Sequence, residues 1–252
     1  MPVRIIPRSY CNVTGLVSSE KSDEMIGYES RPERYFIKQA SFNPNVKSCE
    51  EQPVKIPYTL KTGKPSHYTP DFLVHFKDDL ASTEYWKPLL IEVKPRYNLL
   101  KDWEILHTKF LAARKFSYKR GWEFTIITER ELITPYLDNV VFLTGYRTYP
   151  IDKNGEDLVL DTLQSIPNPT PELILQKITK NKNQIMQLIP VIWKLVANFK
   201  VGVDLESPLT MHSNIWKKPI EEEDYERIYS LCAGRIGHAR WRALRYYTFA
   251  ES

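Results

Sequence analysis

The clearest pattern of apolar and polar positions lies in the first half of the chain. Residues 89–94 (LLIEVK) and 124–128 (FTIIT) are short apolar runs typical of buried strands. Between these runs, apolar side chains recur at steps of three and four residues, at Leu99, Trp103, Leu106, Phe110, Ala113 and Phe116. This spacing predicts an amphipathic helix that ends near Gly121. Strand, helix and strand in this order predict a βαβ unit with two parallel strands.

Upstream of this unit, the pattern predicts one helix and two extended stretches. Ser30 and Glu33 fit a capping box with a proline between them, so a helix is expected from Ser30 to about residue 40. Residues 46–58 and 68–76 are expected to be extended, which makes this half of the chain α/β. Residues 1–27 show little pattern and are expected to form an N-terminal arm.

The second half of the chain is patterned mainly as helices. Thr170 is expected to cap a helix because proline and glutamate follow it. Residues 183–199 predict another helix, which Pro190 is expected to kink or restart. Two short strands within residues 199–216 are expected to form a wing. The turn-like residues 152–155 (DKNG) mark the region of the expected domain boundary.

These elements predict two domains after the N-terminal arm. The first is expected to be an α/β domain over residues 28–148. The second is expected to be a mainly α, winged-helix-like domain over residues 149–252. Winged-helix folds enter DNA grooves in some proteins and dock other proteins elsewhere, so the fold leaves both functions open.

Composition narrows the class of protein only slightly. The chain has 252 residues and a net charge of +4, which is compatible with a nucleic-acid partner. Its 3 cysteines are scattered, which argues against a disulfide framework or a zinc site and for a reducing compartment. No apolar run is long enough to span a membrane, and the first residues do not resemble a signal peptide. We therefore expect a cytoplasmic protein that has no membrane association.

Two opposite charges interrupt the apolar strand at residues 89–94. Glu92 and Lys94 are two positions apart, so they project from the same face, while Ile91 and Val93 face the core. An ion pair buried only for stability gains little, because desolvation offsets the attraction between the charges. A salt bridge at the end of a strand is the ordinary interpretation of these residues when they are considered alone.

A third charged residue favours a functional interpretation. Asp71 follows a proline at the start of an apolar strand, about 20 residues before Glu92, so adjacent strands would bring both carboxylates close to Lys94. Carboxylates bind Mg²⁺, and the ion polarises a phosphoryl oxygen and acidifies bound water. A lysine orients that water or stabilises the developing charge. This short Pro-Asp and Glu-x-Lys pattern is typical of restriction-endonuclease-like nucleases.

Nucleases of this kind often add an acidic residue from the preceding helix. Glu33 is the candidate, although it would serve equally well as the second member of the capping box with Ser30. Glu29 is a second candidate, and an ordinary surface charge is its alternative interpretation.

Several linked blocks of sequence resemble one family. The blocks are ESRPERYFIKQASFNPNVKSCEEQP, HYTPDFLVHFKDD, LLIEVKP and, after the predicted helix, GWEFTIITERELI. In order and spacing they are similar to TnsA, the endonuclease subunit of heteromeric cut-and-paste transposases, over about residues 28–133. The helical second half resembles the C-terminal domain of that family less distinctively.

The resemblance implies a function and partners. TnsA-like proteins cut the 5′ ends of the transposon, which are the non-transferred strands, and a TnsB-like transposase cuts and joins the 3′ ends. A TnsC-like AAA+ ATPase contacts the nuclease subunit and licenses the reaction. The C-terminal domain is the part usually linked to the ATPase and to DNA. The implied cofactor is Mg²⁺, for which Mn²⁺ can substitute.

The resemblance also implies roles for particular residues. The family's catalytic and metal-binding positions correspond to Glu33, Asp71, Glu92 and Lys94. The main-chain carbonyl of Val93 is a further implied metal ligand. Gln52 matches a recurrent family position, for which either a catalytic role or simple packing beneath the site is open.

Basic residues supply candidates for DNA contact. The candidates are Lys109, Arg114, Arg240 and Arg242. The first two lie on the predicted helix after Lys94, where a solvated helix face is an equal alternative. The other two belong to residues 227–249, in which five arginines interleave with aromatic residues and no acid occurs. That composition suits nucleic acid or an acidic partner groove, although the acidic residues 221–224 would also pair with these arginines.

Two other functions compete with that of a transposase subunit. A stand-alone restriction, repair or junction-resolving nuclease would cut DNA without a transposase partner. A non-catalytic adaptor would bind DNA or the ATPase and show no metal-dependent cleavage. The presence of three acids and a lysine argues against the adaptor.

Overall fold

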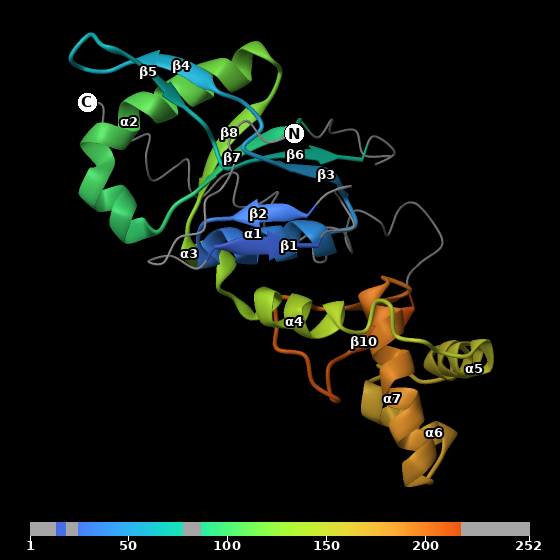
Figure 1. Cartoon of the computed structure of the whole chain (residues 1–252). Helices are drawn as coiled ribbons and strands as arrows, with labels where there is room; N and C mark the ends of the chain where they lie inside the picture. Colours follow the sequence, from blue (N-terminus) through green and yellow to red (C-terminus); the bar gives the residue numbers. More distant parts are fainter. Residues whose placement is uncertain (1–13, 19–24, 78–86, 218–252) are drawn as a thin grey trace. The chain divides into compact units, whose positions relative to one another are not determined.

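The computed structural model describes residues 14–18, 25–77 and 87–217, which form two compact units (Figure 1). The first unit includes the described residues up to Ile133, and the second begins at Thr134. This division falls earlier along the chain than the boundary expected at residue 148. Within the described ranges, no helix combines the length and apolar character needed to cross a membrane.

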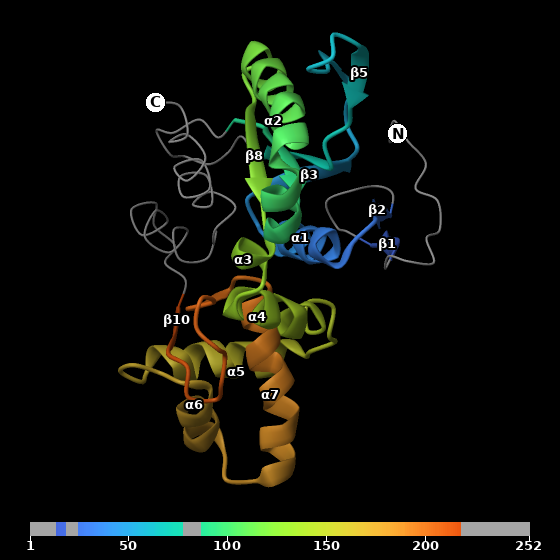
Figure 2. The ribbon, with the colours of Figure 1, turned by 90° about the vertical axis from the view of Figure 1, so that its left-hand side faces the viewer.

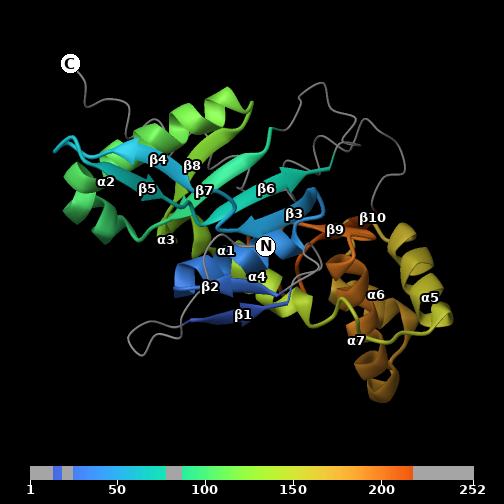
Figure 3. The same cartoon turned by 45° about the horizontal axis from the view of Figure 1, so that its top comes forward.

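A four-stranded mixed sheet forms the centre of the first unit. Its strands, in spatial order, are β3 (Val46–Glu51), β6 (Phe72–Phe76), β7 (Leu89–Val93) and β8 (Glu123–Ile127). The pairs β3–β6 and β6–β7 are antiparallel, while β7 and β8 are parallel. The parallel pair predicted from the βαβ pattern is therefore confirmed (Figure 3).

Helices cover both faces of this sheet, α1 (Arg31–Phe42) on one side and α2 (Arg96–Lys119) on the other (Figure 1). Side chains of β7 alternate between the two layers. Ile91 and Val93 belong to the apolar cluster that contains residues of α1. Leu90 belongs to a second cluster, which contains residues of α2. The side of β7 that carries Leu90 is therefore the side that faces α2.

The ends of α1 and α2 follow from local sequence. The Ser30 hydroxyl accepts a hydrogen bond from the Glu33 N–H at 3.3 Å and caps α1, as predicted. The expected stripe of α2 is buried at Leu99, Leu106, Phe110 and Ala113. Gly121 adopts a φ of +69° directly after α2, a conformation that glycine adopts without steric cost.

Two antiparallel hairpins flank the sheet. One joins β1 (Gly15–Val17) to β2 (Ile26–Tyr28), and the other joins β4 (Ile56–Thr59) to β5 (Pro65–Tyr68). The sequence suggested only an arm over residues 1–27, but Ile26 is buried in the apolar cluster beside α1. This part of the arm therefore contributes Ile26 to the core, and Val17 packs against the same cluster.

The second unit is mainly helical (Figure 2). Its elements are α4 (Pro135–Thr144), α5 (Lys153–Gln164), α6 (Pro171–Ile178), α7 (Lys182–Ala197), β9 (Val201–Val203) and β10 (Ile215–Lys217). Thr170 caps α6, as predicted. Helix α7 runs through Pro190 without restarting, and β9 pairs antiparallel with β10 where a wing was expected. The DKNG sequence, however, is no turn: Asp152 accepts a hydrogen bond from the Gly155 N–H and caps α5.

Candidate functional site

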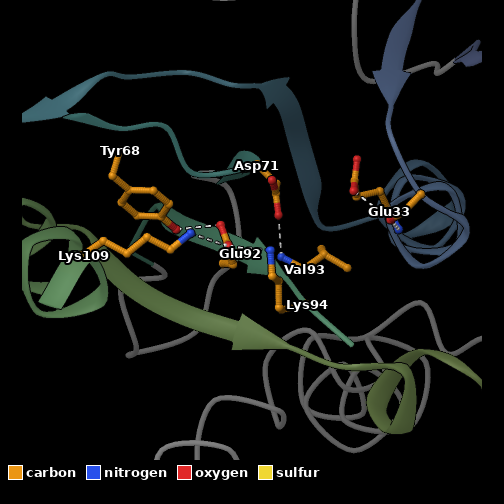
Figure 4. A network of polar contacts seen from close by, with 8 residues as sticks. Glu33, Tyr68, Asp71, Glu92, Val93, Lys94 and Lys109 are labelled. Carbon is orange, nitrogen blue, oxygen red and sulfur yellow. Dashed lines mark hydrogen bonds and ion pairs between the residues drawn. The ribbon is translucent and has the colours of Figure 1, made fainter. Parts of the chain in front are cut away.

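The candidate site lies where β7 ends and β6 begins. Because these strands are antiparallel, the residue before β6 lies beside the end of β7. The Asp71 N–H donates to the Ile91 carbonyl at 3.0 Å, and Asp71 Oδ2 accepts from the Val93 N–H at 2.7 Å (Figure 4). On the other side of β7, the Lys94 N–H donates to the Ile127 carbonyl at 2.9 Å. The backbone therefore fixes Asp71, Val93 and Lys94 together at one edge.

The Glu92 carboxylate is buried beside this edge, with 3% of the residue exposed. Glu92 Oε2 accepts from the Tyr68 hydroxyl at 2.7 Å. Glu92 Oε1 lies 3.2 Å from Lys109 Nζ and 4.0 Å from Lys94 Nζ. Both oxygens thus have polar partners, which a buried carboxylate requires if it is to remain charged without a large free-energy cost.

Lys109 lies in this site rather than on an open helix face. Its side chain is 18% exposed, and its ammonium lies 4.4 Å from the centre of the Tyr68 ring (Figure 4). The ammonium group is therefore held by the Glu92 carboxylate and by an aromatic face. The suggested DNA contact of Lys109 remains a prediction, but the described conformation gives it a partner within the protein.

Asp71 is held in an unfavourable electrostatic environment. Burial raises the pKa of its carboxyl well above the ordinary value of 3.8, and the carboxylates of Glu92 and Glu33 raise the pKa further. The Val93 N–H and the Lys94 ammonium act in the opposite direction. Carboxylates that repel one another in a partly dry site favour a cation among them.

Glu33 serves the helix cap and also lies near the site. Glu33 Oε1 accepts from the Ser30 hydroxyl at 2.7 Å, and Glu33 Oε2 accepts from the Glu29 N–H at 2.7 Å. Burial raises the pKa of the Glu33 carboxyl, and the charges of Glu29 and Glu92 add to this shift. Ser30 caps the helix as predicted, but the Glu33 carboxylate bonds to the Ser30 hydroxyl and the Glu29 N–H rather than to the Ser30 N–H that would complete the capping box. The Glu33 carboxylate remains close enough to interact with the other acids.

A cavity of about 60 Å³ connects several of these groups. Its lining residues are Gly27, Glu29, Glu33, Glu51, Gln52, Thr69, Asp71 and Phe72. Gln52 has a φ of +43°, and its N–H donates to the Asp71 carbonyl at 2.7 Å. The Gln52 side chain donates to Glu29 Oε1 at 3.4 Å, while its own Oε1 is buried without a hydrogen-bond partner. Gln52 thus lies beside Asp71 and supports the backbone there.

The ligand chemistry of these residues suits Mg²⁺, since the donors are carboxylate oxygens of like charge. Among the described residues, however, no three Asp, Glu, His or Cys side chains are close enough together to hold a metal ion in this conformation. Asp71 and Glu33 line the cavity, whereas Glu92 is turned towards Tyr68 and Lys109.

The remaining predicted DNA contacts lie outside this cluster. Arg114 is exposed on α2. Arg240 and Arg242 fall outside the residues that the structure describes. Sequence reasoning missed Tyr68, because an aromatic residue in an extended stretch is usually explained by packing.

A mixed sheet with two acids and a lysine at the end of adjacent strands is the arrangement of restriction-endonuclease-like domains. Residues 43–129 match the family described as TnsA-like endonuclease N terminal. This segment, from β3 to the start of α3 (Glu129–Leu132), is therefore a TnsA-like endonuclease N-terminal domain and indicates a nuclease. It includes Asp71, Glu92 and Lys94, and it begins after Glu33. No curated protein matches the chain.

Proposed function

We propose that this protein is a Mg²⁺-dependent DNA endonuclease that acts as the TnsA-like subunit of a cut-and-paste transposase. It cleaves the 5′, non-transferred strands at transposon ends, together with a TnsB-like transposase and a TnsC-like ATPase. The observation that supports this proposal most strongly is the meeting of Asp71, Glu92 and Lys94 at the end of β7, within the TnsA-like endonuclease domain.

Each residue of the site has a distinct role in this proposal. Asp71, Glu92, Glu33 and the Val93 carbonyl would hold Mg²⁺ or Mn²⁺, and the ion would supply charge neutralisation at the phosphate and lower the pKa of water. Lys94 positions or activates the water that attacks the phosphate, and its ammonium stabilises charge as it develops. Tyr68 and Lys109 act through Glu92, because their hydrogen bonds orient both of its oxygens.

The second unit is proposed to bind partners or DNA in the manner of a winged helix. In support, a two-stranded antiparallel hairpin, β9–β10, follows the helices in sequence. Arg240 and Arg242 are proposed as contacts with DNA or an acidic partner on the basis of sequence alone.

The test is strand-resolved cleavage of a transposon-end duplex in which each strand carries a different label. Full-length protein is incubated in Mg²⁺ or Mn²⁺, alone and with a TnsB-like transposase and a TnsC-like ATPase. Cleavage of the 5′ strand that requires the partners is the expected result. Cleavage by the protein alone would indicate a stand-alone nuclease. Binding of DNA or of the ATPase without any cleavage would indicate an adaptor.

A further inference from the structure

The β4–β5 hairpin has an unusual distribution of charge. Residues 53–70, which include both strands and the turn, contain three lysines and no acidic residue. The lysines are Lys55, Lys61 and Lys64, and all three are exposed. The whole chain carries 35 basic and 31 acidic residues, which are nearly equal numbers. A stretch of this length with lysines and no acidic residue therefore differs from the chain as a whole.

The hairpin has one face packed against α2 and one exposed face. Ile56 and Tyr68 are paired across the two strands, are buried and belong to the apolar cluster beside α2. The next pair along the strands, Pro57 and His67, is exposed on the opposite face. Lys55 shares this outer face by alternation. Lys61 and Lys64 are exposed at the turn. Packing against α2 therefore explains the buried side chains of the hairpin but not its three exposed lysines.

The base of the hairpin is part of the candidate active site. Tyr68, the last residue of β5, donates to Glu92, and Asp71 follows three positions later. Lys64 is four residues from Tyr68, which places it about 13 Å away along an extended strand. Along duplex DNA this corresponds to about four base pairs, at 3.4 Å for each nucleotide of a strand. In Figures 1 and 3 the turn lies at the end of the hairpin away from the four-stranded sheet.

We propose that the exposed lysines of the β4–β5 hairpin and its turn contact the phosphate backbone of duplex DNA beside the cleaved bond. This inference rests on the proposed nuclease function, because it assigns the hairpin to the DNA that the site would cut. The chemistry is that of lysine ammonium groups facing phosphates, which is independent of base sequence.

One ion pair competes with this contact. Lys61 Nζ lies 2.6 Å from Glu104 Oε2, and both side chains are largely exposed, at 64% and 85%. An exposed pair of this kind contributes little to stability, so a phosphate can replace the carboxylate at small cost. The test nevertheless uses Lys55 and Lys64, for which loss of this ion pair cannot complicate the result.

The test measures DNA binding by the full chain at several salt concentrations, without divalent ions. The probe is a fluorescein-labelled duplex of about 30 base pairs, titrated between about 50 and 200 mM salt. The variant is Lys55→Gln combined with Lys64→Gln. The matched control is Lys77→Gln combined with Lys87→Gln, which removes the same charge from exposed positions of the same unit.

For the hairpin variant, the slope of log K against log salt is expected to fall by about 1.8, or 0.9 for each lost phosphate contact. Its Kd is expected to rise by about tenfold or more at the lower salt concentrations. The control is expected to keep the wild-type slope. An unchanged slope in the hairpin variant, an equal loss in both variants, or wild-type protein that does not bind the duplex would each overturn the inference.

A cleavage assay separates this inference from the proposed function. At saturating DNA, the hairpin variant is expected to cleave within about twofold of the wild-type rate, because lost uniform binding raises KM and leaves kcat unchanged. Wild-type protein could bind DNA with a salt dependence that the hairpin variant lowers, and yet cleave nothing under any condition. That result would contradict the nuclease function and would leave the DNA contact of the hairpin supported.

Discussion

The two faces of β7 are equally buried, yet they differ in chemistry. Towards α1, Leu89, Ile91 and Val93 pack into a continuous apolar cluster. Towards α2, Leu90 is followed by Glu92, whose carboxylate accepts from the Tyr68 hydroxyl and from the Lys109 ammonium. An apolar residue at position 92 would avoid the desolvation of a carboxylate and of its lysine partner. The comparison suggests that the α1 face serves stability and that the α2 face was selected for a reaction.

The largest expected effect is that of Asp71→Asn on cleavage. The amide retains an oxygen to accept the Val93 N–H, but it removes a carboxylate that faces Glu92 and Glu33. We expect single-turnover cleavage to fall by at least about 10³-fold, or about 4 kcal/mol. The free energy of unfolding without metal should rise by about 1 kcal/mol, because like-charge repulsion is relieved. A variant that loses both activity and stability would contradict this account.

The opposite pattern is expected on the other face. Ile91→Ala leaves a cavity in the cluster beside α1 and should lower the free energy of unfolding by about 3 kcal/mol. Denaturant unfolding of the full chain measures this change. Cleavage by the fraction that remains folded should stay near the wild-type rate, because the substitution removes only side-chain atoms and keeps the Ile91 carbonyl that accepts from the Asp71 N–H. A loss of activity in fully folded protein would show that the two faces are not separate.

An intermediate effect is expected for Lys109→Met. We expect the maximal cleavage rate to fall about 30-fold, which corresponds to a barrier higher by about 2 kcal/mol. The DNA concentration that gives half-maximal rate should change little. The reason is that Glu92 loses the ammonium group nearest to it, together with one of the hydrogen bonds that orient its carboxylate. Lys101→Met, at an exposed position of the same helix, is the matched control.

A double substitution separates this role from direct DNA contact. In a Glu92→Gln background, Lys109→Met should cause no further loss of rate, because the carboxylate it orients is absent. If Lys109 instead contacts phosphates, the half-saturating DNA concentration should rise and the effect should persist in that background.

The smallest expected effect concerns pH. A carboxyl whose pKa is raised in the folded protein binds its proton more tightly there than in the unfolded chain, so stability falls as pH rises above the ordinary value of 3.8. Relative to Asp71→Asn, metal-free wild-type protein should lose stability as the pH rises from about 4 to 7. Added Mg²⁺ should reduce the difference, since an ion that binds the folded state stabilises it. A difference in stability that is independent of pH and Mg²⁺ would contradict the interpretation that Glu92 and Glu33 raise the pKa of Asp71.

The sequence predicted β7, α2 and β8 well. The two strands are short apolar runs, whereas the apolar residues of the helix recur at steps of three and four residues. It also placed Glu92 and Lys94 together at the end of this strand, where their charged atoms lie 4.0 Å apart. Their catalytic role stays a prediction. The contact of Lys109 was not predicted, although a signal exists. Lys109 lies three positions after Leu106 and four before Ala113, on the buried stripe of the helix, and an ammonium at such a position requires a polar partner inside the protein.

Other features depend on contacts that local sequence does not encode. The strand β2 has three residues, too few for a recognisable alternation, and its place in the core depends on residues distant in sequence. The DKNG sequence looked like a turn because asparagine and glycine favour turns, but Asp152 caps a helix there. The positive φ of Gln52 likewise follows from the tertiary structure, in which its N–H bonds to the Asp71 carbonyl.

The central claim is that the end of β7 is a catalytic edge, and one variant tests it most directly. Single-turnover cleavage of a labelled transposon-end duplex should be measured with Lys94→Ala and wild-type protein, in Mg²⁺ and with the partner subunits present. DNA binding should be measured in parallel. The account predicts a loss of at least about 10³-fold in rate with unchanged DNA affinity. Cleavage at the wild-type rate by Lys94→Ala would contradict it.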